Sequence, residues 1–188
     1  MRKKAVPWTV KELSDRFPSI DFPEYQREPT VWDRAAKQLL IDSMLRKFDI
    51  ASLYMYKDSD GALDCIDGRQ RIGAIMSFLR QNPDNPDNGF ALSLTNEVYE
   101  DQAAEQPFLK FNEMPLSAIE LQAKEKNDKV AQQLLDDLMN YELTVVELSD
   151  SRRPAEFNLQ FTRLNLGAIR NAIRPVYQRL GIVPRADE

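Results

Sequence analysis

The sequence predicts an α+β fold in one compact domain. Two runs with alternating side chains, 52–57 and 62–66, flank the turn Asp58-Ser59-Asp60-Gly61 and indicate a β-hairpin. Segments with apolar residues at three- and four-residue spacing precede and follow that hairpin, and a run rich in β-branched residues, 143–148, predicts a later strand. Strands and helices mixed in this order are typical of the α+β class.

Two helices are predicted ahead of the hairpin. Thr9 and Glu12 fit a capping box, which opens a short helix to about residue 17. Two prolines, at 18 and 23, favour an extended segment over 19–24. Asp33 is a suitable N-cap for the second helix, whose predicted apolar face is Ala36, Leu39, Leu40, Met44 and Phe48.

The elements after the hairpin are predicted in the same way. An apolar stripe places a third helix directly after Gly68, residues 90–94 favour a short strand, and 116–141 are helix-rich. Ser151 caps a last predicted helix whose inward positions are Phe157, Phe161 and Leu164. We therefore assign 1–17 to an N-terminal helix, 18–167 to the main domain and 168–188 to a C-terminal tail.

Composition and charge limit the chemistry. The 188 residues contain no histidine, which excludes Ser-His-Asp, Cys-His and HNH-type sites in this chain, and the single cysteine, Cys65, excludes disulfide scaffolds and multi-cysteine zinc sites. The net charge is −5, so phosphate binding requires a local cluster of Arg and Lys, with Mg²⁺ as the expected metal. No apolar run approaches a membrane span and the N-terminus does not resemble a signal peptide, so we expect a cytoplasmic protein without a membrane partner.

The strongest chemical signal is the run Asp67-Gly68-Arg69-Gln70-Arg71 between a predicted strand and a predicted helix. A helix N-terminus offers unpaired N–H groups, and Gly68 lets an anion approach the backbone. Arg69 and Arg71 add forked donors for phosphate oxygens, Gln70 can donate and accept, and Asp67 can hold a Mg²⁺-bound water or orient an arginine. The alternative is a tight Asp-Gly turn followed by solvated arginines.

Two weaker signals lie far from this turn in the sequence. Gln26 and Arg27 occupy a segment bounded by prolines, from which side chains can point into a groove. Trp32 can stack on a base or anchor the next helix, and packing is the favoured interpretation. Arg163 and Asn165 fall on one side of the last predicted helix, where the alternative for Arg163 is a solvated or ion-paired side chain.

Taken together, these motifs resemble the N-terminal domain of GmrSD-type proteins, which are type IV restriction systems against modified phage DNA. The resemblance covers about 18–167 and rests on the following runs: Phe22-Pro23-Glu24-Tyr25-Gln26-Arg27, Trp32, Leu40-Ile41-Asp42-Ser43, Ile66 to Arg71, and Phe161 to Gly167. It implies a ParB/sulfiredoxin-like fold, in which a small mixed sheet with a hairpin is packed by helices. It also implies nucleotide binding, often with NTP hydrolysis, coupled to DNA sensing or cleavage.

The resemblance implies roles for particular residues. Asp67 and Gln70 are the expected catalytic residues, and Asp67 is the expected metal ligand. The expected nucleotide- or phosphate-binding residues are Gln26, Arg27, Gly68, Arg69, Arg71, Arg163 and Asn165, and the implied cofactors are an NTP and Mg²⁺. Arg69 stands where the family usually has glutamine, which makes the motif more basic, and the family pattern is lost after Gly167, where Pro175 interrupts any helix.

The leading hypothesis is a nucleotide-binding regulatory or sensor domain, with NTP hydrolysis as its candidate activity, in a DNA-restriction or anti-phage defence protein. The nuclease domain that such proteins often carry is absent from these 188 residues. The alternatives are a ParB-like DNA-binding or DNA-nicking module and a non-catalytic interaction module. The expected partners are a nucleotide, DNA under the alternative, and either a separate nuclease subunit or a second copy of the chain.

Overall fold

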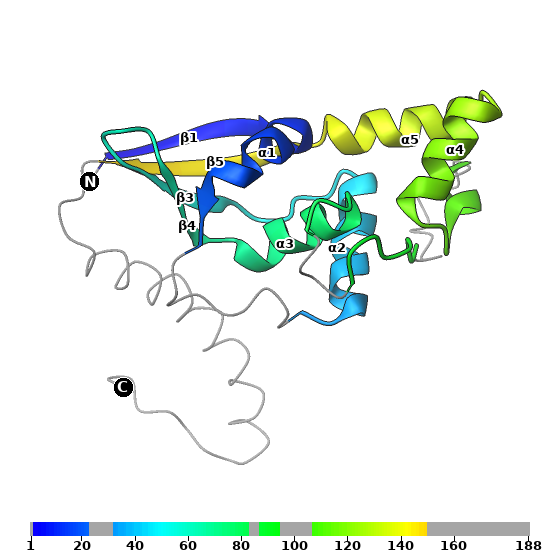
Figure 1. The fold of residues 1–188 in the computed structure, drawn as a ribbon, viewed down its shortest axis with the longest axis horizontal. Helices are drawn as coiled ribbons and strands as arrows, with labels where there is room; N and C mark the ends of the chain where they lie inside the picture. Colours follow the sequence, from blue (N-terminus) through cyan, green and yellow to red (C-terminus); the bar gives the residue numbers. More distant parts are fainter. Residues whose placement is uncertain (1, 23–31, 83–86, 95–106, 150–188) are drawn as a thin grey trace, which may run out of the picture.

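A mixed β-sheet and the helices packed on one of its faces make up the described part of the molecule. The computed structural model describes residues 2–22, 32–82, 87–94 and 107–149, and in them a five-stranded sheet has the order β1-β5-β3-β4-β2 (Figure 1). The strands are β1 (Arg2–Thr9), β2 (Ile20–Asp21), β3 (Leu53–Lys57), β4 (Leu63–Asp67) and β5 (Glu142–Ser149). The pairs β1–β5 and β3–β4 are antiparallel, whereas β3–β5 and β2–β4 are parallel. The predicted α+β class and the predicted hairpin are therefore confirmed.

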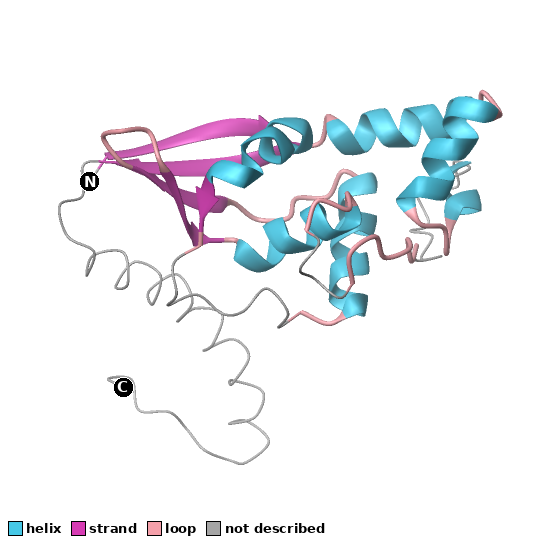
Figure 2. Cartoon of the chain, viewed as in Figure 1, coloured by secondary structure: helices cyan, strands magenta, loops and turns pink. Residues whose placement is uncertain are grey.

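Helices pack against one face of the sheet and continue beyond its end (Figure 2). The α-helices are α1 (Val10–Arg16), α2 (Arg34–Leu45), α3 (Arg69–Phe78), α4 (Leu116–Glu125) and α5 (Lys129–Met139), and the short 3-10 helices are η1 (Phe17–Ser19) and η2 (Pro107–Phe111). Side chains of α1, α2 and α3 join Leu53, Met55 and Val145 of the sheet in one hydrophobic cluster. The region predicted as helix-rich, 116–141, divides into α4 and α5, where Asp128 caps α5.

The helix starts follow the signals in the sequence. Both hydrogen bonds of the predicted capping box are present, since the Thr9 hydroxyl accepts from the Glu12 amide and the Glu12 carboxylate accepts from the Thr9 amide. Asp33 caps α2 by accepting from the Ala36 amide at 2.8 Å. The alternation in β3 is also as predicted, because Leu53 and Met55 are buried while Tyr54 and Tyr56 on the opposite face are partly exposed.

The N-terminal segment differs from its prediction. Residues 2–9 form β1, which pairs along its whole length with β5, so the segment assigned to an N-terminal helix also supplies an edge strand. Trp8, Val10 and Leu13 are buried in the same cluster as the later elements. The predicted short strand at 90–94 is reduced to a single bridge between Ala91 and Pro115.

The buried face of α2 is also rotated from the predicted one. Leu39 and Phe48, which the pattern places inward, are 56% and 43% exposed, respectively. The buried positions include Lys37, which is 2% exposed and donates from Nζ to Asp87 Oδ2 at 2.8 Å. A lysine with a carboxylate partner therefore occupies a place on the inner face where the hydrophobic pattern predicts apolar residues.

Within the part of the chain that the structure describes, no helix has the length and apolar character needed to cross a membrane.

We predict that Asp87→Asn destabilises the protein and flattens its stability at acid pH. Hydrogen bonds from Lys37 and Arg34 lower the pKa of Asp87 from its ordinary value of 3.8, so this contribution is present above that pH and is lost as the pH falls through the lowered pKa. Removing the carboxylate charge beside buried Lys37 is expected to cost about 1–3 kcal/mol of unfolding free energy at neutral pH. Urea unfolding at a series of pH values measures both effects.

Arg34→Ala is the matched control, because the Arg34 side chain donates to the same carboxylate but is largely exposed. It is expected to cost about 1 kcal/mol or less. Equal losses in the two variants would contradict a special role for the buried lysine.

Candidate functional site

The predicted turn lies between a strand and a helix, as expected. β4 ends at Asp67, Gly68 has φ 114° and ψ 4°, and α3 starts at Arg69. The Ile72 amide donates to the Gly68 carbonyl at 2.9 Å and closes the first helical turn. Because Gly68 has no side chain, it cannot cap α3, so its position supplies no side-chain hydrogen bond to the first-turn amides at the positive end of the helix dipole.

Gly68 is required here for two separate reasons. Its φ lies in the left-handed region that side chains disfavour. A Cβ at this position would also overlap Cδ2 of Leu53, a fully buried residue of β3. The close approach of the turn to β3 therefore depends on the absence of a side chain.

Arg71 is held by the protein itself. Its Nη1 donates to the carbonyls of Ile50 at 3.0 Å and Ser52 at 3.1 Å, and its Nη2 donates to Asp67 Oδ2 at 2.9 Å. The Arg71 side chain is 13% exposed. These contacts show the alternative considered for Asp67, namely that its carboxylate orients an arginine. Phosphate binding by Arg71 stays a prediction. It would have to use guanidinium N–H groups that do not donate to these three acceptors.

Arg69 is placed differently. Its guanidinium lies over the ring of Phe22, 5.5 Å from the centroid. Its Nε is buried and has no hydrogen-bond partner among the described residues. A buried N–H without an acceptor costs about 1–3 kcal/mol, so this nitrogen is an unsatisfied donor at the first residue of α3.

Gln70 connects the turn to α2. Its Oε1 accepts a hydrogen bond from the Trp32 amide at 3.2 Å, one residue before the Asp33 cap. The Trp32 ring is partly buried against the hydrophobic cluster, which confirms packing as its role. The contact fixes Gln70 at the first turn of α3 and brings the end of the segment that carries Gln26 and Arg27 to this site.

The carboxylates near the turn do not form a metal cluster. Asp64 lies opposite Asp21 in the β2–β4 pair, and burial together with the charges of Asp21 and Asp58 raises the pKa of Asp64. The described residues contain no group of three side chains that could together hold a metal ion. Mg²⁺, however, often binds through one or two carboxylates and the phosphates of its substrate, so the single carboxylate of Asp67 fits that mode.

Four predicted site residues lie outside the described residues. These are Gln26, Arg27, Arg163 and Asn165, and Phe161 of the same motif also lies there. Their convergence on the Asp67–Arg71 turn stays a prediction. Sequence reasoning did not identify Phe22 as a partner of Arg69, nor the carbonyls of Ile50 and Ser52 as partners of Arg71, because backbone acceptors leave no signal in a sequence.

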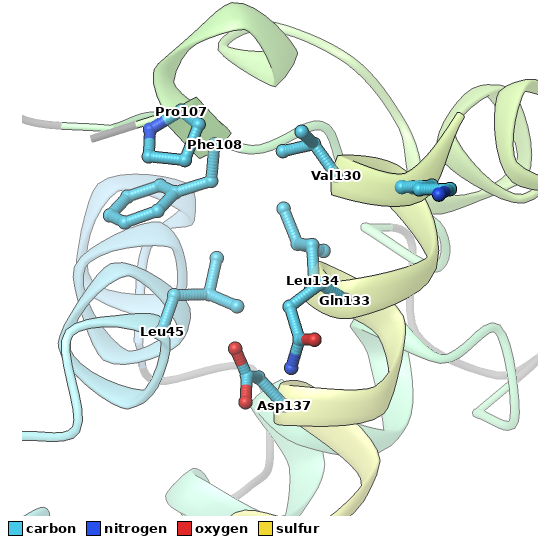
Figure 3. A pocket seen from close by; sticks show the side chains of 8 residues that line it. Leu45, Pro107, Phe108, Val130, Gln133, Leu134 and Asp137 are labelled. Atoms are coloured by element: carbon cyan, nitrogen blue, oxygen red, sulfur yellow. The ribbon is translucent and has the colours of Figure 1, made fainter. Parts of the chain in front are cut away.

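A separate pocket of about 220 Å³ lies between α2, η2 and α5 (Figure 3). It is mainly apolar, with Leu45, Phe108, Val130 and Leu134 among its walls. None of its lining residues belongs to β4 or α3. It therefore offers no phosphate donors next to the turn and is distinct from the candidate site.

Comparison with models of protein families identifies a family for this chain. A model of the family described as "GmrSD restriction endonuclease, N-terminal domain" matches residues 10–170. The matched region contains the whole Asp67–Arg71 turn and runs past the end of β5, and it confirms the resemblance identified from the motifs. None of the curated proteins matches the chain.

We predict that Gly68→Ala is more destabilising than the same substitution at another glycine with a positive φ. Gly61 provides the matched control, because it also has a positive φ (90°) but no atom lies within 4 Å of the position that a Cβ would take there. Gly61→Ala is expected to cost about 1–2 kcal/mol, and Gly68→Ala about 1–3 kcal/mol more because of the overlap with Leu53. Thermal and urea unfolding measure the difference, and equal losses would refute the close approach.

We predict that Arg71→Ala lowers the unfolding free energy by on the order of 2–4 kcal/mol, since it removes three hydrogen bonds at a largely buried position. Arg71→Lys should recover little of this, because an ammonium group lacks the planar fork that reaches both carbonyls and the carboxylate. Urea unfolding at pH 7 is the measurement. Wild-type stability in Arg71→Ala would show that the guanidinium is not needed to hold the turn.

Proposed function

Because the chain belongs to the family of GmrSD restriction endonuclease N-terminal domains, which are part of DNA-restriction defence proteins, we propose that it is the nucleotide-binding regulatory or sensor domain of such a system. The observation that carries this proposal is the buried Nε of Arg69, which has no hydrogen-bond partner among the described residues, at the N-terminus of α3, where Gly68 gives no side-chain cap. A ParB/sulfiredoxin-like fold, which the mixed sheet and its hairpin support, is part of the same proposal.

The turn combines the features that phosphate recognition needs. The first amides of α3 point toward its N-terminus, and Gly68 at the N-cap adds no side-chain hydrogen bond to them. Arg69 supplies a fixed guanidinium, whose stacking on Phe22 restricts its rotamers before a ligand binds. Preorganised donors stabilise phosphate charge more than mobile ones do, because they need no reorganisation on binding.

The remaining motif residues take supporting and chemical roles in this proposal. Arg71 is a positioning residue that orients Asp67. Asp67 would hold Mg²⁺ through its second carboxylate oxygen together with ligand phosphates, and the metal when bound would neutralise phosphate charge. Gln70, held through Oε1, would donate from its Nε2 to a phosphate oxygen or an attacking water. Hydrolysis of a nucleoside triphosphate is the candidate reaction.

DNA binding is the second candidate function, and one observation favours it. Arg2, Lys3 and Lys4 are exposed on edge strand β1, and the Lys3 ammonium lies over the ring of Tyr54, the register partner of Asp67. Successive side chains of a strand point to opposite faces, so of these three cations Lys3 lies on the Tyr54 side, where its charge would suit a nucleic-acid backbone. Its signature would be an affinity for DNA that falls steeply with salt.

We predict that the pure protein binds at least one of the four ribonucleoside triphosphates in the presence of Mg²⁺, and that Arg69→Ala weakens this binding roughly 10- to 100-fold. The unfolding free energy should change by about 1 kcal/mol or less, because the variant loses one cation–π contact but also removes an unsatisfied donor. Isothermal titration calorimetry and thermal unfolding measure the two quantities.

Arg80→Ala is the matched control, because it removes the same charge just beyond the other end of α3, where Arg80 pairs with Glu120 at the surface. Its nucleotide affinity should remain at the wild-type value. Absence of binding to all four nucleotides would refute the proposal and favour an interaction module. Salt-sensitive DNA binding without nucleotide binding would favour the second candidate.

A further inference from the structure

The face of the sheet opposite the described helices carries buried apolar side chains. We define this second face by Tyr54 and Tyr56 of β3 and by Val146 and Leu148 of β5. In the β3–β5 register, Tyr54 lies beside Val146 and Tyr56 lies beside Leu148. Leu53, Met55 and Val145 alternate with these residues along the strands and belong to the cluster on the helix-covered face. None of the second-face residues belongs to the hydrophobic cluster that α1, α2 and α3 complete.

The burial on this face is not explained by its neighbours in the sheet. Val146 is 4% exposed and Leu148 is 1% exposed. Their register partners on β1, Ala5 and Lys3, are exposed. The Lys3 side chain reaches across β5 to the ring of Tyr54 and covers part of this face. Side chains on a sheet otherwise stand roughly perpendicular to it, so near-complete burial of both Val146 and Leu148 points to a second layer.

We propose that residues 151–167 are this second layer and dock on the second face through Phe157, Phe161 and Leu164. These residues lie outside the described part of the chain, and three observations select them. β5 ends at Ser149, one residue after Leu148, so the segment starts at the edge of the face. Its aromatic and aliphatic residues recur at spacings of four and three, which gives one apolar stripe. The family match continues beyond β5 to residue 170.

Another segment fits the face less well. Residues 23–31 join β2 to α2, and β2 is at the edge of the sheet, separated from β5 by β4 and β3. Their sequence, Pro-Glu-Tyr-Gln-Arg-Glu-Pro-Thr-Val, has three charged residues and no apolar stripe. The second face therefore takes the segment that follows β5.

Cysteine cross-linking in the full chain tests the docking. In a Cys65→Ala background, Tyr56→Cys places a thiol beside Leu148, and a second cysteine is introduced at each position from 155 to 166 in turn. We expect intramolecular disulfides whose yield peaks every three or four positions. Thr144→Cys is the matched control, because Thr144 is on the same face of β5 but exposed, and it should cross-link at least tenfold less.

The outcomes distinguish whether residues 151–167 or a second copy of the chain covers the second face. Absence of intramolecular disulfides at all positions, or equal yields without a period, would overturn the proposal. Disulfides that join two chains would also overturn it, and would identify a second copy as the cover. None of these measurements involves nucleotide, so their failure is distinguishable from failure of the proposed binding function.

A stability measurement gives an independent readout. Leu148→Ala and Phe161→Ala should each lower Tm by on the order of 5–10 °C, and the double variant should lose less than the sum because the two side chains share a contact. Leu39→Ala removes an exposed apolar side chain of α2 and should change Tm by about 1 °C or less. A wild-type Tm for Phe161→Ala, or strictly additive losses, would contradict the docking.

Discussion

The guanidinium of Arg71 joins the two strands of the central hairpin at the point where the candidate site is built. It reaches the carbonyls of Ile50 and Ser52, just before β3, and the carboxylate of Asp67, the last residue of β4. These contacts satisfy one buried cation, two carbonyls and one carboxylate at once, which is the condition under which buried charge is tolerated. The position of the Gly68 turn, and therefore the start of α3, depends on this arrangement.

Buried cations are used in several ways in this acidic protein. Arg46 pairs with Asp42 at 2.9 Å within α2 and its C-cap, and Lys37 pairs with Asp87. In both cases a carboxylate compensates the cation, so its attraction for a further anion is reduced. Arg69 differs, because an aromatic ring supports its guanidinium and no hydrogen bond satisfies its Nε within the described residues. In a chain with a net charge of −5, this arginine is the cation that the proposed phosphate recognition uses.

The sequence predicted local structure better than long-range structure. The Thr9 and Asp33 caps, the alternation of β3 and the helix after Gly68 all depend on residues within a few positions of one another, and all are confirmed. β1 was not predicted, because three basic residues and a proline are not typical of a strand: Arg2, Lys3, Lys4 and Pro7. Its stability comes from pairing with β5. The buried face of α2 was predicted wrongly because Asp87, the carboxylate partner of buried Lys37, is fifty residues away in the sequence.

The candidate site shows the same limit. The residue types of the turn were sufficient to predict a strand–glycine–helix junction, since φ preference and helix capping act locally. They were not sufficient to distinguish Arg69 from Arg71, because the acceptors that hold Arg71 are backbone carbonyls and the ring beneath Arg69 comes from Phe22. Two nearby arginines of one motif thus have different roles, which only the three-dimensional arrangement reveals.

The pairing of β1 with β5 also sets an order of events during protein synthesis. Thr9 pairs with Glu142 and Arg2 with Ser149, so β1 cannot find its place until the chain has been translated through β5. At roughly 5–20 residues per second the wait is on the order of ten seconds, during which the hairpin and its helices can already collapse. The lysines and the proline of β1 then have a second use, because they keep a waiting strand from pairing with another nascent chain.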